Sequence, residues 1–330
     1  MIARRLTPIE AMDLWEHSDE ASAFTRPDHL TRLVDEVEWW GVDRSGEIVA
    51  AWPLVRAVAG GEVRPPPFCY YVGPMFARSL RRGKQHRSWL LISRTFRALI
   101  EAVVETHPCF RFSLPPGLTD VRALEWWNFD HPDRSGFTLT PRYTARIDLS
   151  EIADVDELHA NMARMKRRDI GRWSAQPPEV VQGVPAERVV ALHDEALQRS
   201  GGAGGDARRE SLERLLGLAG SGSGCVLGLI PATSSRIEAV IVLLDGPEES
   251  NDVLCVASGE WREAGLTAWA TWLGIRRAHS LGKRWFDFNG ANSPDRALDK
   301  HFYGAGTELY FNGSFGPRFA GATTSEGAGE

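Results

Sequence analysis

The sequence predicts a mixed α/β protein made of two similar domains that pack around a cleft. The chain has 330 residues, which is longer than a chain that folds around one small hydrophobic core, so two domains are expected. Its composition, 43% hydrophobic and 25% charged, is that of a folded globular protein and excludes a disordered chain. One order of helices and strands occurs twice, at an offset of about 175 to 190 residues, which indicates an internal duplication.

The first half opens with two helical patterns and continues into a β-hairpin. Its two strands, VEWWGV and EIVAAWPLVRAV, are joined by Asp43-Arg44-Ser45-Gly46, a typical hairpin turn. The elements expected here are helices at TPIEAMDLWEHS and DHLTRLVDE, a strand at CYYVGP, a helix over about 86–106, a strand at CFRFSLP, a short helix at TDVRALEWWNF and an extended run at FTLTPRYTARIDLS.

The second half repeats this order. CYYVGP corresponds to LCVASG, and CFRFSLP corresponds to RWFDFNG. We therefore expect domains at residues 1–145 and 146–312, with residues 313–330 as a candidate addition to the first. The elements expected are helices over about 154–173 and 186–199, a hairpin of CVLGLI and IEAVIVLLD, a strand at DVLCVAS, a helix at EAGLTAWATWLGIRRAHSLG, a strand at RWFDFNG, a helix at PDRALDKHFYG and a strand at TELYFNG.

The charge pattern restricts the class of partner. The net charge is −6 and the pI is near 5.9, so no overall basic field favours nucleic acid. No run of about 18 apolar residues and no apolar signal core is present, which predicts a cytoplasmic protein without a membrane span. Two local stretches are nevertheless basic: residues 78–97 hold seven Lys or Arg and no acid, and 164–172 hold five with one acid.

These basic stretches have two interpretations. A charge run is usually a solvated face, but phosphate contacts dominate nucleic-acid affinity and need only a local patch. The candidate tRNA-binding residues are Arg81, Arg82, Lys84, Lys166, Arg167 and Arg168. The same patch could hold the diphosphate of an acceptor or of coenzyme A.

Reactive side chains gather near the C-terminus, in GKRWFDFNGANSPDRALDKHFYGAG. A strand carries Asp287, and the following helix carries Lys300, His301 and Tyr303. The corresponding stretch of the first half has no counterpart of the Lys300 and Tyr303 pair. This asymmetry makes the second copy the candidate reaction site, and the alternative is an ordinary strand-to-helix corner.

The order hairpin, strand, helix, strand, helix, strand resembles the Gcn5-related N-acetyltransferase (GNAT) fold. Two copies in one chain resemble the Fem-type (FemABX) transferases, which add amino acids from aminoacyl-tRNA to peptidoglycan precursors, and their acetyltransferase-like relatives. The stretches that carry the resemblance are YYVGP, RYTARIDLS, NMARMKRRDIGRW, FDFNG and KHFYG. The chain departs from the family in lacking a long coiled-coil arm, and Arg199-Ser200-Gly201-Gly202 lacks the family's aromatic residue.

The resemblance implies roles for individual residues. It places Lys300 beside the acyl-transfer centre, where a cation stabilises the oxyanion or the leaving ribose. It makes Tyr303 a proton donor to the leaving group. Asp287 alternates with Phe286 and Phe288 in its strand, and a carboxylate there either bonds to backbone or helps to position the amine. For each of the three, packing or solvation is the competing interpretation. The candidate substrate-binding residues are Arg199, Tyr71, Gly73, Arg262, Gly265 and Asn289.

The loop from Arg262 to Ala268 resembles a degraded form of the family's acyl-CoA loop. A helix N-terminus there would favour a diphosphate, whereas Glu263 would repel one.

We therefore expect an acyltransferase that forms an amide from aminoacyl-tRNA and an amine of a peptide, cell-wall precursor or natural-product acceptor. An acetyl-CoA-dependent N-acetyltransferase acting on a small amine and a non-catalytic binding protein remain alternatives. Direct attack without a permanently bound cofactor, metal or enzyme nucleophile is implied, and the oligomeric state is open.

Overall fold

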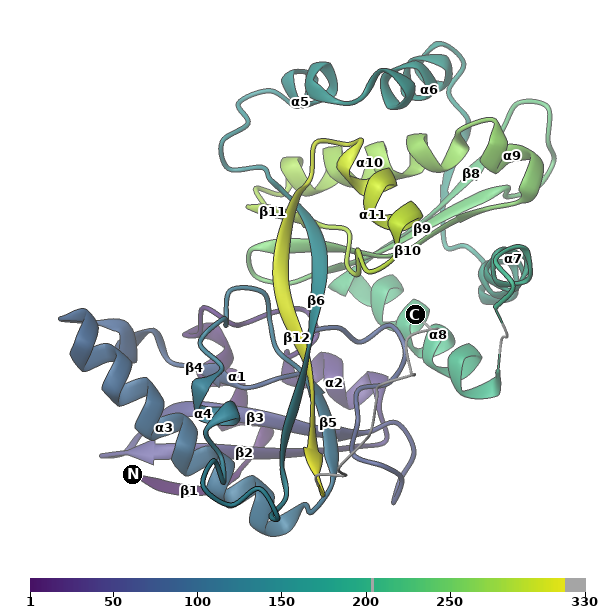
Figure 1. The fold of residues 1–330 in the computed structure, drawn as a ribbon. Coiled ribbons are helices and arrows are strands. Elements are labelled where there is room, and N and C mark those ends of the chain that lie inside the picture. Colours follow the sequence, from purple (N-terminus) through teal and green to yellow (C-terminus); the bar gives the residue numbers. More distant parts are fainter. Residues whose placement is uncertain (203–204, 318–330) are drawn as a thin grey trace. The chain divides into compact units, whose positions relative to one another are not determined.

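The computed structural model describes residues 1–202 and 205–317, and the chain divides into two compact units (Figure 1). Of the described residues, unit 1 comprises 1–142 and 309–317, and unit 2 comprises 143–202 and 205–308. Strands β6 (Gly136–Asp148) and β12 (Gly306–Gly316) each begin in one unit and end in the other. Of the residues expected as an addition to the first domain, 318–330 lie outside the described part.

Unit 1 contains an antiparallel sheet in the order β1-β2-β3-β4, and β5 pairs with β12. The predicted hairpin is confirmed: β2 pairs with β3, and the Asp43 carboxylate accepts a hydrogen bond of 2.8 Å from the Gly46 N–H. The elements of unit 1 are β1 (Ile2–Leu6), α1 (Pro8–Glu16), α2 (Pro27–Leu33), β2 (Glu36–Arg44), β3 (Glu47–Arg56), β4 (Met75–Phe76), the 3-10 helix η1 (Arg78–Arg81), α3 (Gln85–Thr106), β5 (Phe110–Ser113) and α4 (Arg122–Glu125).

The strand predicted at CYYVGP is wrong. Phe68 and Tyr71 have φ angles of +64° and +55°, a conformation that an extended strand excludes, and the chain becomes a strand only at β4. The backbone at Gly73 instead approaches β5 so closely that a Cβ there would lie 2.5 Å from the Ser113 carbonyl oxygen. The proposed correspondence between CYYVGP and the strand LCVASG therefore fails.

Unit 2 contains a mixed sheet in the order β6-β11-β10-β9-β8-β7. Helices α10 and α7 both pack on β9 and β10, from opposite faces of the sheet (Figure 1). The elements of unit 2 are α5 (Val155–Asn161), α6 (Arg164–Ala175), β7 (Glu179–Gln182), α7 (Ala186–Arg199), α8 (Asp206–Leu218), the π-helix η2 (Ala219–Ser223), β8 (Gly224–Ile230), β9 (Ala239–Asp245), β10 (Glu249–Ala257), α9 (Gly259–Glu263), α10 (Leu266–Ser280), β11 (Trp285–Asp287) and α11 (Pro294–His301).

One prediction for unit 2 needs correction, and two elements of unit 2 had no prediction. The helix expected over 154–173 is two helices, because Met162 and Ala163 are extended (ψ 157° and 144°) and end α5 before α6 begins. Helix α8 and the edge strand β7 were not predicted. The hairpin of CVLGLI and IEAVIVLLD is confirmed as β8 and β9.

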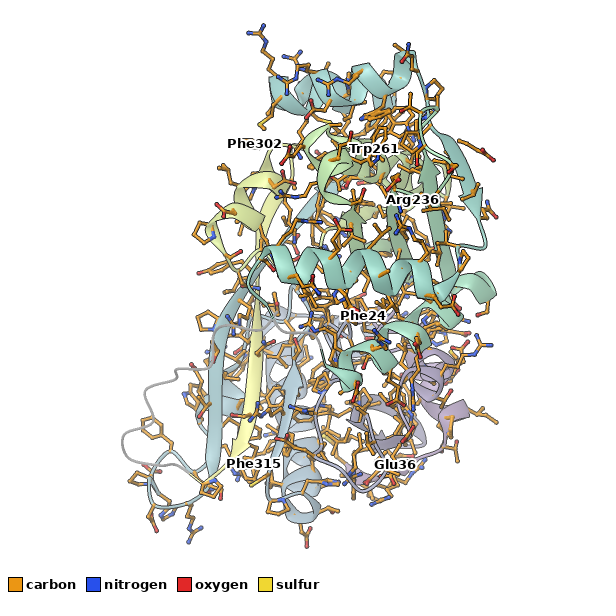
Figure 2. All side chains as sticks on the ribbon, turned by 90° about the vertical axis from the view of Figure 1, so that its right-hand side faces the viewer. Phe24, Glu36, Arg236, Trp261, Phe302 and Phe315 are labelled. Carbon is orange, nitrogen blue, oxygen red and sulfur yellow. The ribbon has the colours of Figure 1, made fainter. Side chains whose placement is uncertain are left out.

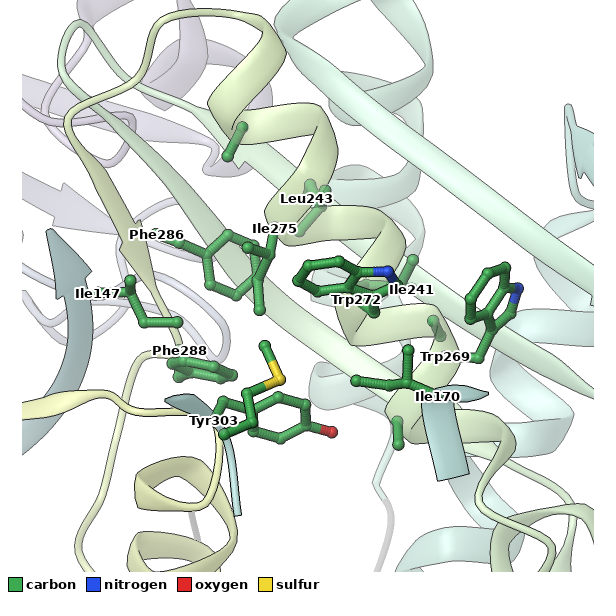
Figure 3. Packing of buried hydrophobic residues seen from close by; sticks show 14 of the residues in the cluster. Ile147, Ile170, Ile241, Leu243, Trp269, Trp272, Ile275, Phe286, Phe288 and Tyr303 are labelled. Atoms are coloured by element: carbon green, nitrogen blue, oxygen red, sulfur yellow. The ribbon is translucent and has the colours of Figure 1, made fainter. Parts of the chain in front are cut away.

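The core of unit 2 forms between the sheet and α10. Trp272 and Ile275 of α10 face Phe286 and Phe288 from the β11 region, and the Tyr303 ring lies against Phe288 at 5.4 Å (Figure 3). This packing fixes the start of the loop after β11, the segment that carries most of the candidate site. Among the described residues, no helix has the length and apolarity needed to cross a membrane.

Candidate active site

Two parallel strands of unit 2 separate at the candidate site. Strand β10 pairs with β11 only from Glu249–Trp285 to Asn251–Asp287. Beyond that point β10 bulges between Asp252 and Leu254 and continues along β9. The chain leaving β11 follows β6 instead, with the Phe288 N–H donating to the Ala145 carbonyl at 2.9 Å. Asp252 and residues 288–290 therefore lie where the strands part.

Asp252 is the functional candidate that sequence reasoning missed. Its Oδ1 is buried and has no hydrogen-bond partner among the described residues, and the same is true of Asn289 Oδ1. The Asn289 side-chain amide donates to the Asp252 backbone carbonyl at 3.1 Å, so the Asn289 side chain lies against the Asp252 backbone. The pKa of Asp252 is raised to about 7: burial raises it most, Lys300 lowers it, and the charges of Asp287 and Asp299 add to the rise.

Buried acceptors without donors need a partner that supplies N–H or O–H groups. A primary amine or ammonium group is such a partner. A carboxylate whose pKa lies near neutrality can also take a proton from that amine, which makes Asp252 suited to general-base chemistry. The only sequence signal was an acid within the apolar run DVLCVAS.

Lys300 is held by the loop that follows β11. Its ammonium group donates to the carbonyl oxygens of Phe288 (3.0 Å), Asn289 and Gly290. These bonds engage all three N–H groups of the ammonium. Desolvation lowers the pKa of Lys300 to about 8, against the attraction of Asp252 and Asp287. The structure therefore places this cation next to the strand separation but leaves it no donor for an oxyanion.

Tyr303 lies beneath this loop and is almost completely buried, with 2% of its surface exposed. Lys166 Nζ sits 4.4 Å from the centre of its ring and forms an ion pair of 2.7 Å with Asp299. Burial raises the pKa of Tyr303 well above its usual value, and Thr271 bonds to its hydroxyl. This environment keeps the phenol neutral and makes it a poor proton donor.

Asp287 is fully buried and already hydrogen-bonded. Its Oδ1 accepts from Thr144 Oγ1 at 2.6 Å and from the Asn289 N–H at 2.8 Å, and its Oδ2 lies 3.2 Å from Arg146 Nε. The Asn289 bond fixes a residue whose φ is +51°, an unusual value for a side-chain-bearing residue. Asp287 therefore orients Asn289, and its negative charge adds to the pKa shift of Asp252.

The N-terminus of α10 is occupied by a side chain of α6. Gly265 caps the helix with a φ of +78°, and a Cβ on it would lie 2.8 Å from the Asp169 Cγ. The Arg172 guanidinium donates to the Ala264 carbonyl at 3.0 Å and fixes α6 there. The Asp169 carboxyl group thus lies where the acyl-CoA resemblance expects a diphosphate. Arg262 is exposed on α9.

The remaining candidates of unit 2 lie on α6 and α7. Arg167 and Arg168 are exposed on α6, one of the helices from which nitrogen-tipped side chains project in Figure 2. Arg168 also pairs with Asp169 at 3.1 Å. Arg199 is exposed, and it donates to Glu195 at 2.5 Å and to the Ala257 carbonyl at 2.8 Å, so it is tied to the end of β10.

Five candidates lie in unit 1. Tyr71 is 2% exposed and packs edge-on against Tyr310 at 5.2 Å, and Gly73 makes the close approach to β5 described above. Arg81 forms ion pairs with Asp19 and Glu20. Arg82 and Lys84 are exposed.

The comparisons with known proteins identify the fold. No protein-family model matches the sequence, and no curated protein matches it either. This chain is similar to the solved structure of FemX. The match covers 94% of this chain and 97% of the FemX chain, with a TM-score of 0.61 and 10% sequence identity. The tandem GNAT protein from the clavulanic acid biosynthesis pathway matches 96% of this chain over 98% of its own, with a TM-score of 0.53 and 13% identity. The chain has a Fem-like tandem GNAT fold.

This tandem GNAT fold also occurs in the C-terminal domain of a putative lysylphosphatidylglycerol synthetase from Agrobacterium fabrum. That match covers 93% of this chain and 91% of the domain, with a TM-score of 0.53 and 15% identity. The predicted fold class, two GNAT-like units with a mixed sheet, is confirmed. At these low identities the likeness concerns the fold.

Proposed function

We propose that this protein is an acyltransferase that forms an amide bond between an amine acceptor and the aminoacyl group of aminoacyl-tRNA. The observation that carries the proposal is the unpartnered Asp252 carboxylate oxygen at the separation of β10 and β11. The Fem-like fold supports the reaction class, because FemX and a lysylphosphatidylglycerol synthetase share it.

The acceptor amine donates N–H bonds to Asp252 Oδ1 and Asn289 Oδ1. Asp252 removes a proton as the amine nitrogen attacks the ester carbonyl carbon. A C–N bond forms, the C–O bond to the ribose breaks, and the proton held by Asp252 passes to the ribose oxygen. General acid–base catalysis of this kind contributes about 10²- to 10⁴-fold in rate.

Lys300 acts as a positioning residue in this proposal. The oxyanion role implied by the family resemblance requires a free N–H, and all three are engaged by carbonyls. Its contribution is to fix residues 288–290 and to place a positive charge beside Asp252, which keeps part of that carboxylate ionised near neutral pH. Tyr303 and Asp287 hold the same loop in place: the Tyr303 ring packs on Phe288, and the Asp287 carboxylate accepts from the Asn289 N–H.

The donor preference rests on the N-terminus of α10. Asp169 and Glu263 both bring negative charge to this helix end, which opposes the binding of a diphosphate. Arg164, Arg167 and Arg168 are exposed on the adjoining helix α6. A local basic face suits the phosphate backbone of tRNA. These features favour aminoacyl-tRNA over acetyl-CoA.

A pair of binding experiments tests this choice. Gel shift with charged tRNA should show binding that weakens as salt rises, and acetyl-CoA should leave the melting temperature unchanged. Stabilisation by acetyl-CoA without tRNA binding would reverse the assignment of the donor. Asp169→Asn is the matched variant for the acetyl-CoA experiment. It removes the negative charge at the N-terminus of α10, so any rise in melting temperature on adding acetyl-CoA should be larger than in wild-type protein, with the fold intact.

A further inference from the structure

Four large apolar side chains are exposed on α3 and in the turn after α4 of unit 1. Trp89 and Leu90 of α3 are 37% and 42% exposed, and Trp126 and Phe129, in the turn that follows α4, are 54% and 71% exposed. The Arg122 guanidinium lies 5.0 Å from the Trp89 ring centre and 5.5 Å from that of Trp126, which brings the two indoles together. The Phe129 N–H donates to the Trp126 carbonyl at 3.3 Å. We call these four residues the aromatic patch.

Hydrogen bonds and cation–π contacts connect the two tryptophans of the aromatic patch. The Asp120 carboxylate accepts bonds of 2.8 and 2.7 Å from Arg122 and one of 2.9 Å from the Trp89 indole. Arg122 also lowers the pKa of Asp120, so the two form an internally neutral pair. Helices α3 and α4 pack side by side (Figure 1). Grouped exposed apolar side chains of this size mark an interaction surface.

The surroundings of the patch indicate the charge of its partner. The segment 78–97 runs from η1 through the first half of α3, and it contains seven basic residues and no acid. Four of the seven are exposed and form no ion pair with any residue in the described ranges: Arg82, Lys84, Arg87 and Arg94. Arg87 and Arg94 lie one turn before and one turn after Leu90 on α3. The exposed acids Glu125 and Asp130 lie on the α4 side.

We propose that the aromatic patch docks unit 1 onto the surface of a membrane that contains anionic phospholipids. Trp and Phe side chains partition to the headgroup level of a bilayer, and Lys and Arg next to them contact lipid phosphates. In this arrangement the basic residues of segment 82–94 supply the electrostatic contact, and the aromatic patch supplies the apolar insertion.

Two other partners fit the surface less well. RNA bases stack on free aromatic faces, but Arg122 covers a face of both indoles and Leu90 offers no ring. A second copy would form an isologous contact, which places the same basic segment of both chains at one interface, where like charges repel. Neither objection applies to an anionic bilayer.

The test uses the full chain in vesicle co-sedimentation. Wild-type protein should bind vesicles of phosphatidylcholine with about 30% phosphatidylglycerol, and bind pure phosphatidylcholine vesicles far less. Neutralising Arg82, Lys84 and Arg87 to Gln should weaken binding about 100-fold, about fivefold for each charge. Trp126→Ser with Phe129→Ser should reduce binding about tenfold or more.

Ile9→Ser is the matched control, since it removes an 82% exposed apolar side chain elsewhere on unit 1 and should leave binding unchanged. Circular dichroism of each variant confirms that the fold is retained. The proposal fails if wild-type protein does not bind the anionic vesicles, or if the charge variant and the Trp126→Ser, Phe129→Ser variant both bind like Ile9→Ser. It fails equally if the wild-type protein self-associates or binds tRNA and the Trp126→Ser, Phe129→Ser variant loses that property but still binds vesicles like wild type.

Discussion

Replacing Asp252 by Asn should lower the catalytic activity and, at neutral pH, raise the stability of the fold. The amide keeps the shape of the side chain but cannot accept the proton of the acceptor amine. We expect a loss of about 10²- to 10⁴-fold in kcat/KM. Because Asp252 must be ionised to act as the base, the wild-type rate should fall about tenfold per pH unit below a pKa of about 7. The variant should lack this dependence.

The same substitution should stabilise the fold at neutral pH. The folded protein holds the Asp252 proton up to about pH 7, whereas the unfolded chain releases it near pH 4. Between these values the folded state binds more protons, so wild-type stability falls as pH rises. About three pKa units correspond to about 4 kcal/mol at most, and partial exposure of the side chain reduces the expected gain to about 1–2 kcal/mol.

Two measurements check these expectations. Urea denaturation at pH 5 and pH 8 gives the free energy of unfolding, and transfer of a labelled amino acid from charged tRNA to an amine gives the rate. Asp156→Asn, an exposed carboxylate of α5, is the matched control and should change neither. A variant that is both as active as wild type and no more stable at pH 8 would refute the reasoning.

Three further predictions concern the residues around the site. Lys300→Ala leaves three carbonyls without a donor and should destabilise the fold by about 2–3 kcal/mol in urea denaturation; unchanged stability would show that the carbonyl contacts are weak. Arg167→Gln with Arg168→Gln should lower tRNA affinity. It should also reduce the slope of log affinity against log salt concentration by about two, as expected for the loss of two phosphate contacts. Arg276→Gln, which changes an exposed arginine of α10, should alter neither the affinity nor the slope. Gly265→Ala combines a positive φ with a clash against α6 and should cost about 1–3 kcal/mol; an unchanged melting temperature would argue against that close approach.

Hydrophobic periodicity predicted the regular parts of the fold because those parts depend on local patterns. The hairpins β2–β3 and β8–β9 and the helices α3 and α7 all follow from alternation or from a helical repeat. Two segments needed tertiary information. CYYVGP is apolar like a strand, yet the close approach of Gly73 to β5 imposes a turn-rich path. The break at Met162 contains neither Gly nor Pro, so no local signal marks it.

The candidate site was predictable only in part. The stretch from Asp287 to Tyr303 was identified because its residues are close in sequence. Asp252 was not, since a single acid at the start of an apolar run also suits a strand end. Its importance arises from the bulge and from the separation of β10 from β11, which are contacts between distant segments. The engagement of Lys300 by three carbonyls also depends on the fold of the loop after β11.

The central claim is that an aminoacyl group moves from tRNA to an amine. The most direct measurement is a single-turnover reaction of the full chain with tRNA charged with labelled amino acids and a panel of peptide and small-molecule amines. The account predicts that label appears in an amide product with wild-type protein and at least about 100-fold more slowly with Asp252→Asn. Label that stays on the tRNA, while labelled acetyl-CoA acetylates the same amines, would contradict it.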